Sequence, residues 1–301
     1  MRINEFVRLK RNVQKMQEWL QLAGYLDPDM FAEQKRYKPP VMKWAAPDGI
    51  YGPQTKAAFY AWTDRYCPPI RETIHGIYPE DILEKMAAAQ ALPDLSLGDP
   101  AARIVAHMQQ QQMYISMRHD TLNIVYLEGV NKDFRVIENV IDEWNDLRIL
   151  IRILPNGVPV IVRHYEATVD PGLYYTNNPI NRAGAARVVH GQYKAWKMGV
   201  HRGTQPALQQ DGPVLVHRDK NKDGKRIGDE IAIQTVTINQ HSTSAEYKGD
   251  KIGKYSAGCL VGRHMNEHID FLEILKTDAR YVTNNNYKFV TAILDGKQIF
   301  S

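Results

Sequence analysis

Cysteine is almost absent from this chain, which has only Cys67 and Cys259 among its 301 residues. Two cysteines cannot build a disulfide framework, so packing must stabilise the fold. Long apolar runs are lacking too, and none approaches the roughly 18 to 20 residues of a membrane helix. The stretch from Met1 to Leu20 is too charged for the apolar part of a signal peptide. We therefore expect a soluble protein, made in the cytoplasm without a standard export signal.

The composition is that of a globular protein with more than one compact unit. Hydrophobic residues make up 44% of the 301 positions, enough for two or three units that each bury a core. The net charge of +4 and the pI near 8.8 suit an acidic polymer such as cell wall or nucleic acid. An ordinary solvated surface explains the same charge equally well, so the charge alone selects no partner.

The first part of the chain predicts two helices. Apolar residues recur at helical spacing from Val7 to Leu22, and Gly24 ends that helix. A second helix is expected from Asp48 and runs through Trp62. Between them, the stretch from Leu26 to Pro47 is rich in Pro, Lys and Asp and is expected to be an extended loop.

These helices carry two ordered patterns: Val13-x-x-Met16-Gln17-x-x-Leu20-x-x-x-Gly24-Tyr25, and Asp48-Gly49-Ile50-Tyr51-Gly52-x-x-Thr55-x-x-Ala58-Phe59. In that order they resemble the small three-helix peptidoglycan-binding module found in many wall enzymes. The departure is the insertion before Asp48. The resemblance implies that residues 1–69 form such a module and bind peptidoglycan.

The remainder divides at about Thr121. Residues 70–120 are helical in pattern and are expected to form a connector. From Thr121 onward β-branched and alternating stretches predict strands, with two helices, one at Arg187 to Lys197 and one at Met265 to Lys276. The predicted fold class is therefore α+β and multidomain: an N-terminal helical module, a helical connector, and a mainly β unit over 121–301.

That β unit holds a histidine and a cysteine at a suggestive spacing. His241 follows the strand-like run Ile231 to Ile238, and Cys259 follows Gly258. A strand-loop-strand hairpin could bring the imidazole beside the thiol, which it would deprotonate. Glycine before the thiol lets backbone amides approach a bound carbonyl, as an oxyanion site requires. A lone cysteine is more often a small core residue, so the pairing carries the inference.

The spacing resembles the signature of the L,D-transpeptidase catalytic domain: His, fourteen to seventeen residues, then Ser or Thr, His, Gly, Cys. This chain has His241, Ser256, Gly258 and Cys259 at the matching positions. The resemblance implies that Cys259 is the nucleophile, that His241 is the base, and that the Ser242 carbonyl orients its ring. The amides of Gly258 and Cys259 would form the oxyanion hole.

Two positions depart from that signature. Ala257 stands where the family has a second histidine, and Val261 replaces a polar residue. The second histidine shapes the acceptor side of the family's site. Its loss argues more firmly for formation of a thioester than for transfer to an amine.

Five residues are expected to contact the substrate: Ser256, Tyr255, His201, Trp144 and Arg148. Aromatic and polar side chains of this kind suit a polymer of sugars and peptides. Structural roles in turns and at strand ends explain the same residues, His201 in particular.

A calcium-loop pattern lies upstream of the motif: Asp219-x-Asn221-x-Asp223-Gly224-x5-Glu230. In the template, Asp219, Asn221, Asp223 and Glu230 supply oxygen ligands. Strand-like flanks argue against a helix-loop-helix hand, and a solvated hairpin loop with Asx turns explains the pattern as well. No cofactor is required by the motif chemistry, and structural calcium stays an open expectation.

Together the two resemblances predict a peptidoglycan-binding cysteine enzyme. It would cleave stem peptides like a phage endolysin, or exchange their bonds as an L,D-transpeptidase does. Lacking a signal peptide, it would reach the wall through a separate pore after synthesis in the cytoplasm, which favours cleavage. The expected partner is bacterial peptidoglycan, with no nucleic acid and no membrane insertion, and the expected state is a monomer.

Two other functions stay open. One is a wall-binding or virion structural protein with a degenerate catalytic domain. The other is a zinc-dependent wall peptidase, because His264-x-x-Glu267-His268 matches an inverted zinc-protease pattern.

Overall fold

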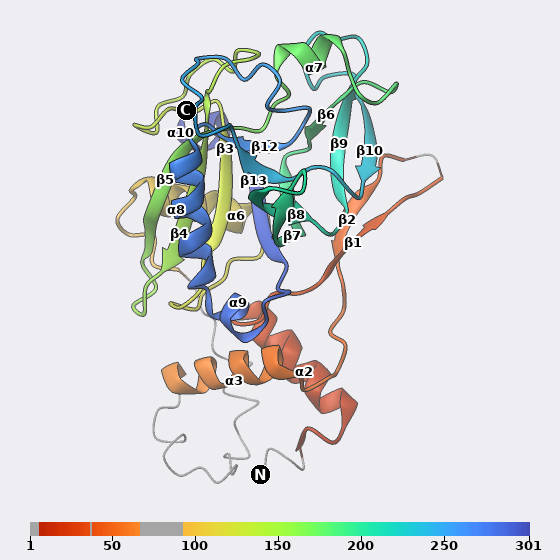
Figure 1. Ribbon diagram of the computed structural model, residues 1–301. Coiled ribbons are helices and arrows are strands. Elements are labelled where there is room, and N and C mark those ends of the chain that lie inside the picture. The colour runs from red at the N-terminus through yellow and green to blue at the C-terminus, as the bar shows by residue number, and fades with distance from the viewer. Residues whose placement is uncertain (1–5, 37, 67–92) are drawn as a thin grey trace.

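A closed sheet dominates the computed structural model, which describes residues 6–36, 38–66 and 93–301 (Figure 1). Eight strands follow one another in the order β11-β12-β5-β4-β3-β13-β7-β8 and close into a barrel. Neighbours are antiparallel except for β3 with β13 and β11 with β12, which run parallel. The strands are β3 Asn123–Glu128, β4 Asp146–Ile153, β5 Pro159–Thr168, β7 Gly191–His201, β8 Gln205–Gln210, β11 Gln240–Ser242, β12 Leu260–Gly262 and β13 Phe289–Asp295.

Strand β4 is buried on both faces, although three of its eight residues are charged. Ile149 and Ile151 belong to a core shared with Ile104 of α6 (Pro100–Gln110), whereas Leu150 belongs to a second core, shared with Tyr126 and Phe271. Successive side chains of a strand point to opposite faces, so one strand supplies both cores. A strand covered on both faces loses the polar alternation that a half-exposed strand shows.

A smaller antiparallel sheet stands beside the barrel, next to β7 and β8 in Figure 1. Its order is β10-β9-β6, with β6 Ala185–Val188, β9 Val214–Asp219 and β10 Glu230–Gln234. The helix predicted from Arg187 to Lys197 is wrong, because this stretch forms the end of β6, a turn and the start of β7. Pairing with β9 and β13 outweighs the local helix preference of its Lys, Gln and Ala residues.

The predicted fold class is wrong at the N-terminus, where no three-helix module appears in the described residues. Two helices are present there, α2 Lys10–Leu22 and α3 Pro53–Tyr66. The stretch between them, expected to be a loop, contains an antiparallel hairpin of β1 Met30–Glu33 and β2 Val41–Trp44. Among the described residues the structure has 7 helices, only 4 of them seven residues or longer, and it is mostly β-sheet.

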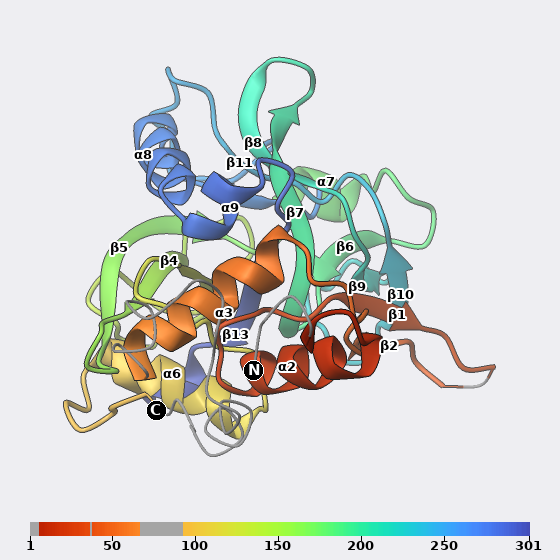
Figure 2. The ribbon, with the colours of Figure 1, turned by 90° about the horizontal axis from the view of Figure 1, so that it is seen from below.

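Helices α2 and α3 lie below the barrel in Figure 1 and in front of it in Figure 2, which is the view from below. Met16 and Leu20 of α2 and Trp62 of α3 are fully buried and share one apolar core with Ile104 and with Ile149 of the barrel. The spacing of Met16 and Leu20 places both on one helix face, as the sequence indicated. The buried face of these helices is therefore part of a core that extends into the rest of the chain.

The remaining helices lie around the barrel: α7 Leu173–Asn177, α8 Met265–Lys276, α9 Ala279–Thr283 and α10 Lys297–Phe300. The helix predicted at Met265 to Lys276 is confirmed by α8. Of the expected connector at 70–120, residues 70–92 lie outside the described residues and α6 lies inside them. No helix within the described ranges is long and apolar enough to cross a membrane.

Candidate active site

Two short parallel strands bring the histidine and the cysteine together. His241 lies in the middle of β11, and Cys259 directly precedes β12. In the register of this pair, Gln240 is opposite Leu260 and His241 is opposite Val261. The two strands run parallel, so the expected hairpin is wrong, and the residues between them form a crossover instead. The register nevertheless sets the thiol beside the start of β11.

His241 is held as a neutral base. Its Nδ1 lies 2.8 Å from the carbonyl oxygen of Ser242, and its Nε2 is buried without a hydrogen-bond partner in the described chain. A carbonyl only accepts, so Nδ1 carries the proton and Nε2 keeps its lone pair. Burial, followed by the nearby His201, lowers the pKa of His241 to about 3. The ring is therefore neutral at any ordinary pH.

His201, the last residue of β7, stacks on His241. Their ring centroids are 3.8 Å apart and their planes differ by 11°. The amide nitrogen of Asn239 donates to His201 Nδ1 at 3.0 Å, while its oxygen accepts from the Gln210 amide at 2.9 Å. This second bond fixes the orientation of the Asn239 amide, so the His201 proton sits on Nε2.

The thiol of Cys259 is also neutral at rest. One ring nitrogen each of His201 and His241, together with Cys259 Sγ, lie within 4.8 Å of one another. The thiol donates to the carbonyl oxygen of Thr237 at 3.2 Å. Burial raises its pKa to about 11. With thiol and imidazole both shifted toward their neutral forms, the resting pair is a thiol and a free base rather than a thiolate-imidazolium pair.

The turn before Cys259 depends on glycine. Gly258 has φ +117°, a value that residues with a side chain rarely adopt, and a Cβ there would lie 2.5 Å from the carbonyl oxygen of Ala186. Its amide donates to Ser256 Oγ at 3.2 Å, and Ser256 Oγ donates to the Cys259 carbonyl oxygen at 2.9 Å. Ser256 is fully buried and organises the turn rather than facing a ligand.

Of the two amides expected at an oxyanion hole, that of Gly258 is thus already used within the turn. The amide of Cys259 makes no hydrogen bond to another group of the described chain. The backbone amide of Asn239 also approaches the sulfur and favours its thiolate form. An oxyanion at this site would therefore accept a hydrogen bond from the Cys259 amide rather than from the Gly258 amide.

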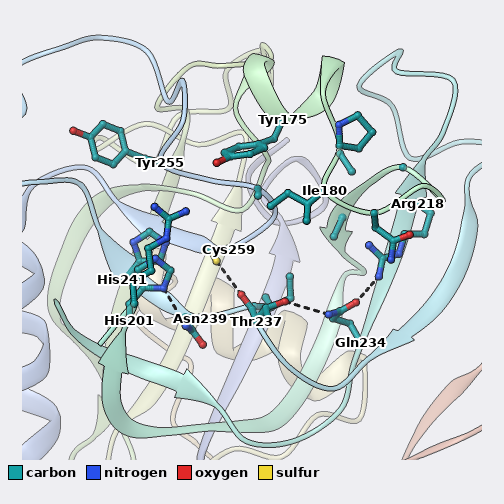
Figure 3. A pocket seen from close by; sticks show the side chains of 18 of the residues that line it. Tyr175, Ile180, His201, Arg218, Gln234, Thr237, Asn239, His241, Tyr255 and Cys259 are labelled. Atoms are coloured by element: carbon teal, nitrogen blue, oxygen red, sulfur yellow. Dashed lines mark hydrogen bonds between the residues drawn. The ribbon is translucent and has the colours of Figure 1, made fainter. Parts of the chain in front are cut away.

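An open cleft of about 700 Å³ leads to the thiol (Figure 3). Cys259, His241 and His201 lie on one side of it, and Tyr255 and Ala257 border the same space. A second hollow of about 440 Å³ lies on the Ser242 side and also reaches His201, His241 and Tyr255. The imidazole pair thus borders both spaces, of which only the larger reaches the sulfur of Cys259.

Two residues expected to contact substrate do not line this cleft, although Trp144 shares a small buried cluster with Cys259. Trp144 donates through its Nε1 to the Tyr247 hydroxyl at 2.9 Å and packs against Tyr247. Arg148 has no exposed surface, and its guanidinium lies over the ring of Phe271 and bonds to His268 Nδ1 at 2.9 Å. The structure therefore gives both residues packing roles. Alternation along β4 explains this for Arg148, whose side chain points to the barrel interior.

The calcium-loop residues bond to one another and to the backbone of their own loop. They occupy the hairpin between β9 and β10, where Asp219 Oδ2 accepts from the Gly224 amide at 3.0 Å and Asp223 Oδ1 from the Lys225 amide at 2.8 Å. Asn221 donates to Asp223 at 3.0 Å, and Glu230 begins β10. Within the described ranges, the carboxylates of this loop form no group of three potential ligands. The loop satisfies its own backbone, as Asx turns do.

The zinc-protease pattern at His264 to His268 is not assembled either. His268 is fully buried, and its two ring nitrogens lie near Arg148 Nη1 and the Pro206 carbonyl oxygen. A ring occupied on both sides has no lone pair for a metal. In the described part of the chain, the set that could hold an ion is His201, His241 and Cys259. Its two imidazoles and one thiol suit zinc or another thiophilic metal.

Sequence reasoning missed Asn239 and Thr237, which hold His201 and the thiol respectively. A signal for Asn239 was present, since it stands two positions before His241, and side chains at that spacing share one face of extended chain. Thr237 holds the thiol through its backbone carbonyl oxygen, which side-chain alternation does not predict. Thr237 itself has φ +79°, an unusual value for a β-branched residue, which no local pattern predicts.

Comparisons with known proteins add no relative: no family model, no curated protein and no solved structure matches this chain.

Proposed function

We propose that the protein is a cysteine enzyme that forms a thioester between Cys259 and an acyl group of a peptide substrate. The observation that carries this proposal is the Nε2 lone pair of His241, which is buried, unpartnered and next to a thiol at the end of an open cleft. A base without a competing partner, oriented by the Ser242 carbonyl, has the arrangement of a nucleophile, base and orienter set.

The reaction starts from neutral groups. As Cys259 Sγ attacks the carbonyl carbon of an amide, its proton passes to His241 Nε2, and the oxygen gains the negative charge. Collapse of the tetrahedral intermediate breaks the carbon-nitrogen bond, and the imidazolium returns the proton to the leaving amine. Water then attacks the thioester, losing its proton to the same nitrogen, and the thiol is restored. The low pKa of His241 makes the imidazolium short-lived, which favours rapid return of the proton.

The substrate class is proposed from the motif. His241, Ser256, Gly258 and Cys259 keep the spacing of the L,D-transpeptidase signature, so we propose the stem peptide of bacterial peptidoglycan as the acyl donor. We propose hydrolysis rather than exchange as the outcome. Ala257 borders the cleft where that signature has an imidazole, so no second base is offered there to an acceptor amine.

The test is incubation of the enzyme with purified sacculi, with products and intact enzyme read by mass spectrometry. The expected products are shortened stem peptides, with an acyl adduct on Cys259. Both Cys259→Ala and His241→Ala should lose the activity by at least about a hundredfold, while His119→Ala, a change at an exposed histidine, should keep it. New cross-links without loss of stem-peptide bonds would reject hydrolysis.

Two further measurements distinguish the proposed enzyme from the alternative functions. A wall-binding protein with a degenerate site would give neither products nor adduct, although it would sediment with sacculi. A metallopeptidase would lose its activity on chelation and keep it in Cys259→Ala. Activity that survives chelation and is lost in Cys259→Ala supports the thioester mechanism.

A further inference from the structure

The cleft that leads to Cys259 has a one-sided charge. Three arginines border it, Arg182, Arg202 and Arg218, and no aspartate or glutamate of the described chain does. None of the three has an ion-pair partner within the described ranges. A concave surface with cations and no anions raises the local concentration of an anionic ligand. Arg182 and Arg202 are exposed, however, and water screens them.

Arg218 differs from the other two because it is buried. Only 7% of it is exposed, and its side chain projects from β9 into the cleft, as Figure 3 shows. Its guanidinium makes one hydrogen bond within the described chain, to the amide oxygen of Gln234. Glu230 is opposite it in the strand register and still forms no ion pair with it. Burial lowers the pKa of Arg218, and no carboxylate offsets that effect.

Comparable arginines in this protein are paired. Arg187 and Arg280 are each 3% exposed, and each lies within 3.2 Å of a carboxylate, Asp170 and Asp278 respectively. Removing a guanidinium from water without a counter-ion costs several kcal/mol. Arg148, buried without an acid as well, lies over an aromatic ring inside the barrel. No aromatic ring lies under the Arg218 guanidinium in the described chain, and the group faces an open space.

A chain of contacts relates Arg218 to the reacting sulfur. Arg218 donates to Gln234 Oε1, and Gln234 Nε2 donates to Thr237 Oγ1 at 3.2 Å. The Thr237 carbonyl oxygen in turn accepts from Cys259 Sγ. Figure 3 shows these groups along one wall of the cleft. A ligand group bound at Arg218 would therefore be placed along the same wall as the thiol.

We propose that Arg218 is a carboxylate-binding residue, and that the cleft takes ligands with a free carboxylate several bonds from the group that meets Cys259. The planar guanidinium can donate two parallel N–H bonds to a carboxylate, which fixes orientation as well as position. That this ligand is the acyl donor rests on the proposed function. The binding itself does not.

The experiment compares two thiol reagents that differ only in charge, 6-maleimidohexanoate and 6-maleimidohexanamide. Their rates of addition to Cys259 in the full-length protein are measured by mass spectrometry of the peptide that contains it. Relative to N-acetylcysteine, the wild type should prefer the carboxylate by about tenfold, equivalent to about 1.4 kcal/mol. In Arg218→Gln that preference should fall to the value for N-acetylcysteine, while the rate with the amide changes less than about twofold.

Arg135→Gln is the matched control, because it removes the same charge from an exposed position outside the cleft and should keep the preference. Arg218→Lys keeps the charge without the paired N–H groups and should lower the preference partly, which preserves the test if Arg218→Gln does not fold. A preference unchanged in both Arg218 variants would overturn the proposal. So would protection by inorganic phosphate but not by acetate at equal ionic strength, because the ligand would then be a phosphate.

This assay needs no acyl transfer. A carboxylate preference without an acyl adduct from sacculi would keep the binding residue and reject the proposed enzyme. An acyl adduct from sacculi without a carboxylate preference would support the proposed enzyme and reject Arg218 as the binding residue.

Discussion

The imidazole ring of His201 lies parallel to that of His241, with centroids 3.8 Å apart and planes 11° apart. Two stacked imidazoles cannot both be charged without strong repulsion. Accordingly His201 adds to burial in lowering the pKa of His241, and burial also lowers the pKa of His201. The stack therefore keeps both rings neutral and leaves the Nε2 lone pair of His241 available to the thiol.

Replacing His201 with phenylalanine should raise the pKa of His241. The aromatic ring keeps the stack, but it removes a neighbour whose positive form opposes a charge on His241. The measurement is the pH titration of the His241 ring by NMR in wild type and His201→Phe. His119→Phe, a change at an exposed site, is the control and should leave the titration unchanged. An equal titration of His241 in all three proteins would contradict the electrostatic role of the stack.

The reactivity of Cys259 should climb steadily with pH. Because burial raises the thiol pKa to about 11, the thiolate fraction rises about tenfold for each pH unit between 7 and 9. The rate of alkylation by iodoacetamide, read at the peptide that contains Cys259, should follow that slope. His241→Ala should change this rate little, because the resting thiol is not ionised by His241. A rate that levels off near pH 7 would instead indicate a thiolate-imidazolium pair.

Local spacing explains what could be predicted of the site. His241, Ser242, Gly258 and Cys259 lie within nineteen positions of the sequence, and their order carries their chemistry whatever surrounds them. Asn239 was within reach of the same reasoning through its alternation with His241. Arg218 was not, because it joins the cleft only through the packing of the small sheet, where β6 lies against Gly258. Packing between sheets leaves no periodic trace in a sequence.

In the fold, too, local spacing predicts some features, whereas long-range packing sets others. Helices α2 and α8 could be predicted from their amphipathic spacing, because each has one buried face. Arg187 to Lys197 was misread because its partners, β9 and β13, are distant in the sequence. The N-terminal pattern around Met16 and Trp62 indicated helices correctly, but it could not reveal that these residues share one apolar core with α6 and with barrel residues such as Ile149.

Gly258→Ala should be among the most destabilising single changes in this protein. The positive φ of Gly258 strains any side chain, and the added Cβ would lie 2.5 Å from the Ala186 carbonyl oxygen. Displacing that backbone costs more than strain alone, so we expect a loss of about 3 kcal/mol or more in urea unfolding. Gly203→Ala is the matched control, since Gly203 has φ +78° with nothing within 4 Å. Its expected loss is about 1 kcal/mol, and equal losses would contradict the close contact.

Acid should destabilise the protein partly through His241. Its folded-state pKa is about 3 against 6.5 for an unperturbed histidine, so the unfolded chain binds the extra proton between these values. The stability due to neutral His241 is thus complete above pH 6.5 and is lost as pH falls toward 3. Between pH 7 and pH 5 this amounts to about 2 kcal/mol. The wild type should lose that much more than His241→Gln in urea unfolding at the two pH values, whereas His119→Gln should behave as the wild type does.

Zinc should bind at Cys259 and block the reactivity of its thiol. Ligand atoms around a tetrahedral zinc lie about 3.3 to 3.7 Å apart, and those of His201, His241 and Cys259 are already within 4.8 Å of one another. Binding requires loss of the thiol proton, whose pKa is about 11, so the zinc affinity should increase about tenfold for each pH unit. His201 must also give up its bond from the Asn239 amide before one of its ring nitrogens can bind zinc. Micromolar zinc should then block alkylation of Cys259, and EDTA should restore it.

His201→Ala should weaken this protection by about tenfold or more, whereas His217→Ala, outside the cluster, should leave it intact. Equal protection in the two variants would mean that zinc binds the thiol without His201, which would contradict the three-residue ion site.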